Sequence, residues 1–421
     1  MDPPKLRLAD TLVALRFKQE PLEAALLGLF EGDTGLADLS APFESETLRA
    51  YEGIVDDAVN LRGRLVNSES ALEEIDLVAL DHIQLSATTS AEHLRVRGVE
   101  YTISDFQSAP LSALLATLYQ LPLDSDERRA AHLRRLTTLP RFLEQAADRH
   151  REGIKHGLTP TARGVGSAVA QIDEVLADRN LSGLRRQLEV ANEDFNYTQD
   201  QLILNEVVPA LHRNRNFLKL EALPVGRSDE QPGLHRLPDG EELYRTLVRA
   251  STSTSRTPED LHATGQAIIE RLNAEFAVIG SRLWGTSDVR EIHQRLRTDP
   301  ELLYADSEEI LASAVATVGR AEEAALEWFG LIPSPHCAVE PVPDALADGS
   351  APAYYFTGAL DGSRPGTFFI NATKPHERYR HMAEAVAFHE AVPGHHFQLT
   401  IAQEQEDSHI VFAVFGDTAS A

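Results

Sequence analysis

Residues 389–396, with the sequence HEAVPGHH, gather three imidazoles and one carboxylate within eight positions. Histidine nitrogens are common zinc ligands, and a His-Glu pair followed one helical turn later by a second His holds the metal beside a general base in many zinc hydrolases. The spacing here differs from the standard H-E-x-x-H, because Pro393 stands where the second His is expected. These residues therefore predict a metal site only if the backbone departs from a regular helix.

An unbroken helix would not bring these histidines together. His389 and His395 would lie on different faces, whereas His389 and His396 would share a face but lie about 10.5 Å apart along the axis. Pro393 cannot donate a hydrogen bond to the carbonyl of His389, and Gly394 tolerates almost any backbone angle. We therefore expect an interruption that returns His395 or His396 to the side of His389, with His395 favoured. The other histidine would orient a ligand or contact the substrate.

Glu390 is the candidate general base. Zinc lowers the pKa of a water molecule that it coordinates towards ~7, and a carboxylate within reach takes the proton of that water as it attacks a carbonyl carbon. Such a site would hydrolyse peptide or other amide bonds. A purely structural histidine cluster would have the same spacing, so spacing alone does not separate the two interpretations.

The elements that precede the histidines are predicted to position them. Residues 353–357 and 367–371 have the β-branched and aromatic content of strands, and the turn-rich sequence LDGSRPG lies between them, which predicts a hairpin with a long loop. A helix is predicted from about residue 377 to 392. Apolar residues at helical spacing place His389 on its buried face. An edge strand beside such a helix could hold an extended peptide by main-chain hydrogen bonds.

The rest of the chain predicts a mainly α fold, a large helical protein with a small hairpin before a zincin-like active-site helix. Thr257 followed by Pro258 and two acidic residues indicates a helix start, and Ser70 with Glu73 has the pattern of a capping box. We expect a helical region over residues 1–330, joined tightly to the first part of a catalytic lobe over 331–421. Apolar periodicity predicts helices near 48–61, 72–83, 105–120, 126–156, 162–195, 198–218, 239–250, 258–280 and 306–330.

The composition of the chain argues against several kinds of partner and site. The formal net charge of −26 argues against nucleic acid or an anionic membrane surface as a partner, because both would be repelled. The single cysteine excludes an internal disulfide and a thiolate-rich metal site. The first residues lack the pattern of a signal peptide, and no apolar run approaches ~18 residues, so a cytoplasmic location is expected.

Residues 360–371 and 389–398 resemble a bacterial family known as domain of unknown function 885, which is grouped with zincin-like metallopeptidases. Residues 360–371 are similar to the turn and strand that precede the family's site, and residues 389–398 are similar to its signature almost residue for residue. Weaker likeness covers residues 237–244 and 257–260. The resemblance implies a mainly helical bacterial protein with a zinc hydrolase site.

Members of that family continue into a Glu-Gly-Trp segment whose Glu would be the third metal ligand, whereas this sequence stops at Ala421. We therefore expect a fragment of a longer protein, with zinc bound in the full-length form and little activity in these 421 residues. The predicted function is a zinc-dependent hydrolase that acts on a peptide or small amide substrate. The alternative is a helical binding or scaffold protein that keeps the fold without the chemistry.

Overall fold

The computed structural model describes residues 3–29, 35–66, 74–106, 108–188, 192–343, 347, 350–405 and 409–414. It divides the chain into two compact units, Met1–Ser253 with Ala359–Arg364 and Asp407–Ala421, and Thr254–Gly358 with Pro365–Glu406. The boundary expected after residue 330 lies inside the second unit. Both units are mainly helical, and the second also contains a small sheet, so the predicted mainly α class with a small sheet is confirmed.

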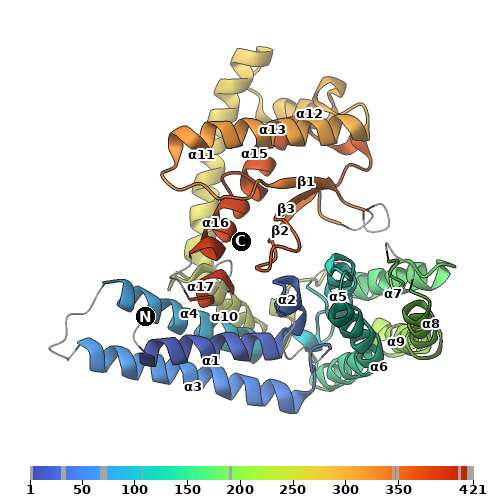
Figure 1. Ribbon diagram of the computed structural model, residues 1–421. Helices are drawn as coiled ribbons and strands as arrows, with labels where there is room; N and C mark the ends of the chain where they lie inside the picture. Colours follow the sequence, from blue (N-terminus) through green and yellow to red (C-terminus); the bar gives the residue numbers. More distant parts are fainter. Residues whose placement is uncertain are drawn as a thin grey trace. The chain divides into compact units, whose positions relative to one another are not determined.

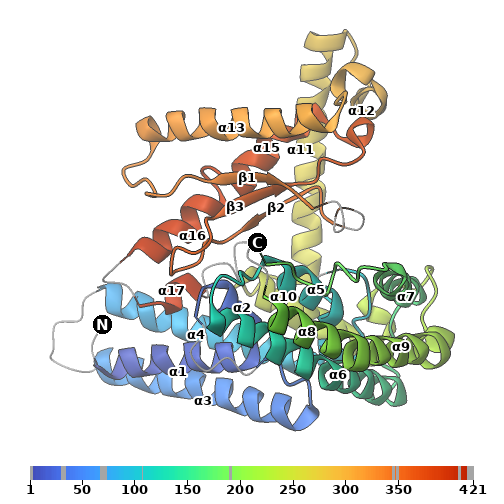
Figure 2. The same ribbon diagram turned by 45° about the vertical axis from the view of Figure 1, so that its right-hand side comes forward.

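The first unit is built from helices that pack around two large apolar clusters. One cluster includes Leu12, Tyr51 and Ile83, and the other includes Leu136 and Val165. Figures 1 and 2 both show α1 and α3 running side by side. The helices are α1 (Pro3–Gln19), α2 (Pro21–Leu26), α3 (Ala41–Val66), α4 (Glu74–Arg95), α5 (Pro110–Gln120), α6 (Asp126–Lys155), α7 (Ala162–Ala177), α8 (Glu193–Leu202), α9 (Val208–Phe217), α10 (Gly240–Thr252) and α17 (Val411–Val414).

Several helices in this unit differ from their predicted bounds, and two of them show the local reason. The helix expected over 162–195 ends at Ala177, because the Asp178 carboxylate accepts hydrogen bonds from the backbone N–H groups of Asn180 and Ser182 at 2.9 and 2.7 Å and turns the chain. The helix expected from residue 105 begins only at Pro110. Asx turns and proline starts override apolar periodicity at these helix ends.

The second unit contains three long helical segments before its sheet: α11 (Pro258–Trp284), α12 (Val289–Thr298) and α13 (Ser307–Trp328). The predicted start of α11 is confirmed, since the Thr257 hydroxyl accepts from the Asp260 N–H and the Asp260 carboxylate accepts from the Thr257 N–H. Helix α12 was not expected from periodicity. The capping box predicted at Ser70 and Glu73 lies outside the described residues.

The sheet has three strands in the order β1-β3-β2: β1 (Ala338–Pro341), β2 (Ala353–Phe356) and β3 (Thr367–Ile370). The predicted hairpin is confirmed, because β2 and β3 pair antiparallel. Strand β1 pairs parallel to β3 and was not predicted, since its prolines indicated only a break in the helix. Phe368 packs with Ala387 in one apolar cluster, and Phe369 packs with Val342 in another, as alternation along a strand requires.

Helices α15 (Arg380–Glu390) and α16 (His395–Glu404) follow the sheet. Helix α15 packs against α13 and β2, and its buried face carries Ala387. The sheet and α13 therefore hold the helix that ends in the His-Glu pair.

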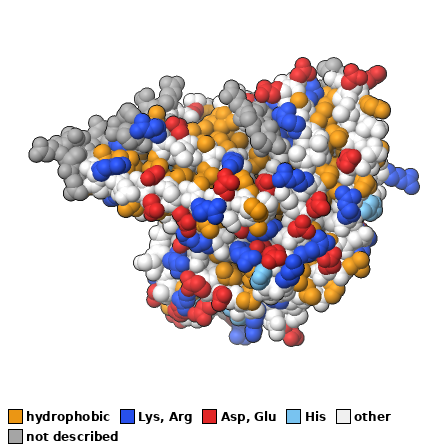
Figure 3. All heavy atoms as spheres, turned by 90° about the horizontal axis from the view of Figure 1, so that it is seen from below, with side chains coloured by type: hydrophobic (Ala, Val, Ile, Leu, Met, Phe, Trp, Pro, Cys, Tyr) orange, Lys and Arg blue, Asp and Glu red, His pale blue; other side chains and the backbone are white. Residues whose placement is uncertain are grey.

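The surface mixes the two signs of charge despite the formal net charge of −26. On the face drawn in Figure 3, described acidic and basic side chains alternate, with apolar side chains between them. Many pair at short range, as Arg151 does with Glu221 at 2.8 Å. In the part of the chain that is described, no helix is long and apolar enough to cross a membrane.

Candidate metal centre

The helix that carries the His-Glu pair is interrupted where the sequence predicted an interruption. Helix α15 ends at Glu390 and α16 begins at His395, with a four-residue turn between them. A Cβ atom added to Gly394 would lie 1.9 Å from the carbonyl oxygen of His389 and 2.5 Å from that of Phe388. The turn can therefore close this tightly only because residue 394 has no side chain.

The turn brings His389, Glu390 and His395 together. One potential ligand atom from each of the three side chains lies within 4.8 Å of the others. The imidazole rings of His389 and His395 are 4.8 Å apart between centroids and meet edge to face at 80°. His389 is exposed, while Glu390 and His395 are half-buried. The group is therefore open to solvent and accessible to a small ion.

His396 lies elsewhere, in the interior of the second unit. It is only 1% exposed, its Nδ1 lies 3.0 Å from the Tyr355 hydroxyl, and its Nε2 lies 2.9 Å from the Pro335 carbonyl oxygen. Burial lowers the pKa of His396, and the bond to Pro335 partly opposes this effect. Because both ring nitrogens are engaged, His396 ties α16 to β2 and to the segment before β1 and is not part of the group formed by the other three residues.

His389 does not face the core, which corrects the expectation drawn from helical periodicity. The core side of α15 is formed by Ala387 together with the partly buried Val386, whereas Met382 is 49% exposed. Short alanines pack against the sheet and α13, so the buried stripe is rotated away from Met382 and His389. The imidazole is consequently free to meet His395.

The three grouped side chains suit zinc in type and approach its geometry. Imidazole nitrogens and a carboxylate oxygen are ligands that zinc accepts in hydrolases. Two atoms bound to one zinc ion at about 2.0–2.1 Å are at most roughly 4.2 Å apart. The 4.8 Å limit on the three ligand atoms is slightly wider, so a small movement of these side chains would be needed to bring all of them within range of one ion.

Some contacts of this region had no local signal in the sequence. The Tyr355 hydroxyl faces His396, and a Cβ added to Gly366 would lie 2.0 Å from that hydroxyl. Tyr355 and Gly366 lie on or next to different strands, so only the paired sheet places them together. Glu384 on α15 forms an ion pair with Arg320 at 2.6 Å.

Comparison with known proteins agrees with this fold. The structure of a "putative lipoprotein" from Colwellia psychrerythraea matches with a TM-score of 0.79 and 18% identity, covering 96% of this chain and 73% of that one. One from Shewanella oneidensis, described as of unknown function, matches with a TM-score of 0.63 and 16% identity, covering 97% and 73%. No curated protein matches. At these identities the likeness concerns the fold alone.

A family model matches the chain over residues 21–420, which is nearly its whole length. That span includes both units and every residue of the candidate metal centre. The chain belongs to the family described as "Bacterial protein of unknown function (DUF885)".

Proposed function

We propose that this protein is a zinc-dependent hydrolase of the zincin type that cleaves peptide or other amide bonds. The observation that supports this proposal most strongly is the grouping of His389, Glu390 and His395 across the turn between α15 and α16. Three such side chains, two of them imidazoles, converge although a straight helix would separate them. A shared metal ion would account for the tight turn at Gly394, which brings them together.

Each residue has a distinct role in the proposed reaction. His389 and His395 would hold the zinc through imidazole nitrogens, and when bound the metal would polarise the substrate carbonyl and acidify the attacking water. Glu390 would accept the proton of that water and then deliver it to the departing amine. His396 would keep α16 in place through its bonds to Tyr355 and Pro335.

The sheet offers a place for an extended substrate. Strand β2 lies at one edge of the sheet and packs beside α15, whose last two residues are His389 and Glu390. An added peptide strand could pair with such an edge by main-chain hydrogen bonds, which favours a peptide over a small amide. Cleavage of a peptide library by the product of the complete gene would identify the substrate.

Metal content tests the proposal directly. The purified product of the complete gene should retain about one zinc per chain after dialysis, and its His389→Ala variant should retain much less, because one imidazole is lost. His381→Ala is the matched control, since His381 is an exposed histidine on the same helix and outside the group. Equal and negligible zinc in wild type and in His389→Ala would refute the hydrolase proposal.

The role of Glu390 requires a second variant. Glu390→Gln should keep the metal and reduce kcat by several orders of magnitude, because an amide cannot accept the proton. Retained turnover would place the base on another residue. Bound zinc with no cleavage of any peptide by the wild type would favour the alternative, a helical binding or scaffold protein.

The cytoplasmic location remains a prediction from the sequence. The description of both structural neighbours as lipoproteins concerns those proteins. Fractionation of cells that express the complete gene would locate this one.

A further inference from the structure

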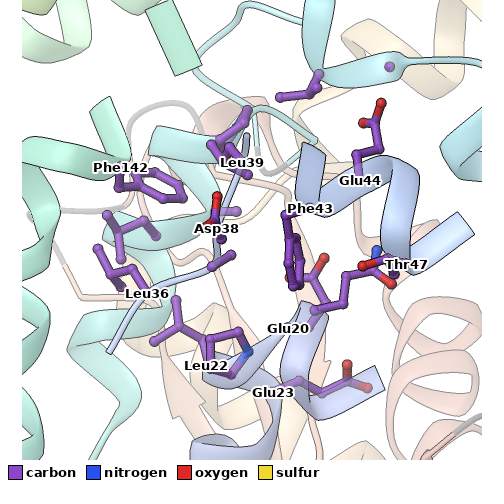
Figure 4. Close-up of a pocket in the computed structure, with 18 of the residues that line it drawn as sticks. Glu20, Leu22, Glu23, Leu36, Asp38, Leu39, Phe43, Glu44, Thr47 and Phe142 are labelled. Atoms are coloured by element: carbon purple, nitrogen blue, oxygen red, sulfur yellow. The ribbon is translucent and has the colours of Figure 1, made fainter. Parts of the chain in front are cut away.

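A cavity of about 610 Å³ lies among the helices of the first unit, and all the residues that line it belong to that unit. Small-molecule sites in proteins typically enclose roughly 300–1,000 Å³. Much of the wall is apolar, and Figure 4 shows Leu22, Leu36 and Phe142 on one side with Phe43 on the other. The cavity is large enough for a small organic molecule with an apolar body.

Two buried polar atoms on cavity-lining residues have no hydrogen-bond partner in the part of the chain that is described. They are the Thr47 hydroxyl and the Nε of Arg149. Thr47 is 1% exposed and Arg149 is 4% exposed. A buried polar group without a partner destabilises the fold, so most such groups in proteins are satisfied. Each of these atoms has an accessible area below 1 Å², so a ligand in the cavity could supply the missing partner once the side chain turns towards it.

Most charges around the cavity already have partners of opposite sign. His93, which also lines the cavity, has its pKa lowered by burial and by nearby Arg16 and is therefore neutral at pH 7. The ion pairs are Arg16–Glu23 at 2.6 Å, Asp38–Arg141 at 2.6 Å, Arg149–Glu44 at 2.6 Å, Arg149–Glu100 at 2.9 Å and Arg97–Glu100 at 2.7 Å. In these pairs each basic side chain is matched by an acidic one.

Glu20 is the exception. It lines the cavity immediately before α2, and its side chain makes no capping hydrogen bond to that helix. Within the described residues its carboxylate takes part in no hydrogen bond or ion pair, although Arg16 is near enough to act on it electrostatically. Burial raises the pKa of the Glu20 carboxyl, and Arg16 partly opposes this effect. The cavity therefore carries one acidic group in excess.

We propose that this cavity is a binding site for a small organic monocation, with an ammonium group held by Glu20 and Thr47 and an apolar body packed against Leu22, Leu36 and Phe142. An ammonium group donates up to three hydrogen bonds and neutralises the one carboxylate in excess. An anion would find no unpaired cation among the described residues around the cavity, and a dication would leave one charge uncompensated in a poorly hydrated space.

Three probes of matched shape test the charge preference: phenylbutylamine, phenylbutanol and phenylbutyrate. Binding to the full-length chain is measured by calorimetry at neutral pH in the presence of EDTA, which keeps any metal out of the candidate centre. The amine should bind about tenfold or more tightly than the alcohol, because a charge-assisted hydrogen bond replaces a neutral one. Phenylbutyrate should bind more weakly than either of them.

Variants locate the site. Glu20→Gln keeps the shape of the side chain and should weaken amine binding about tenfold while leaving alcohol binding unchanged. Thr47→Val should weaken both probes by a smaller factor. Glu46→Gln is the matched control, because Glu46 lies on α3 next to Thr47, is exposed and does not line the cavity. His389→Ala should bind the amine as wild type does, so the result is independent of the proposed function.

The outcomes are exclusive. Preference for the amine that is lost in Glu20→Gln and kept in Glu46→Gln supports the proposal. Equal affinity for all three probes, no saturable binding of the amine, or an amine preference that survives Glu20→Gln would overturn it. If Glu20→Gln did not fold, as judged by circular dichroism, the probe series on the wild type and the Thr47→Val variant would still decide.

Discussion

Replacing Gly394 by alanine should disrupt the candidate metal centre without removing any ligand. The added Cβ would lie 1.9 Å from the His389 carbonyl oxygen, whereas real Cβ contacts essentially never fall below 3.0 Å. The two backbone segments must therefore separate by at least about 1.1 Å. Because these segments carry His389 and His395, the displacement passes directly to the two imidazoles.

The size of the effect follows from the narrow range of zinc–ligand distances. Ligand distances in zinc sites hold within roughly 0.2 Å, so a shift of this size prevents both nitrogens from binding the same ion unless the side chains rotate to compensate. We expect zinc affinity to fall about 10- to 100-fold, the range found when the support of a ligand is removed. Overpacking should also lower the free energy of unfolding by about 1–3 kcal/mol.

The assay is competition for zinc with a chromophoric chelator, combined with urea unfolding. Gly319→Ala is the matched control, because Gly319 lies within α13 of the same unit and an added Cβ there meets no atom within 4 Å. That variant should keep its zinc affinity and gain about 0.5–1 kcal/mol of stability from helix propensity. Wild-type zinc affinity in Gly394→Ala would show that the turn does not set the spacing of the two histidines.

Three further predictions concern stability, each measured by urea unfolding followed by circular dichroism. Tyr355→Phe removes the hydroxyl 3.0 Å from His396 and should cost about 1 kcal/mol; no loss would mean that this bond is replaced by another. Burial lowers the pKa of His132 and of His150 to about 4. Between pH 6.5 and 4 the unfolded chain therefore takes up protons that the folded chain does not. As the pH is lowered through this range, the free energy of unfolding should decrease by up to about 3 kcal/mol for each histidine. His132→Asn should reduce that pH dependence, and an unchanged slope would contradict the assignment. Arg149→Met removes the buried partner of Glu44 and Glu100, although Glu100 keeps Arg97 at 2.7 Å, and should cost about 1–3 kcal/mol. A loss below about 1 kcal/mol would show that water reaches the two carboxylates.

Features with a local physical cause could be predicted from the sequence. The start of α11 follows from Thr257 and Asp260, which satisfy each other's backbone groups within one helical turn. The pairing of β2 with β3 follows from two apolar segments joined by a turn-rich loop. The break before His395 follows from a proline and a glycine that a helix does not accommodate well.

Features that depend on distant contacts could not be predicted in this way. Strand β1 is recognisable only beside β3, whose residues lie about thirty positions later in the chain. The loop Ala359–Arg364 belongs to the first unit, where the Leu360 N–H donates to the Leu27 carbonyl, although the residues on both sides of it belong to the second. No local sequence pattern predicts that a loop packs in a different unit from the residues on both sides of it.

The candidate metal centre combines features that the sequence determines with features that only the folded chain decides. The residue types, and the need for an interruption between His389 and the later histidines, are properties of the sequence, because proline and glycine act through their own backbone chemistry. Which histidine turns towards His389 is decided by packing: Tyr355 and Pro335 engage both nitrogens of His396 in the interior and leave His395 at the surface beside Glu390. Those contacts come from residues 41 and 61 positions away, so only the folded chain brings them to the site.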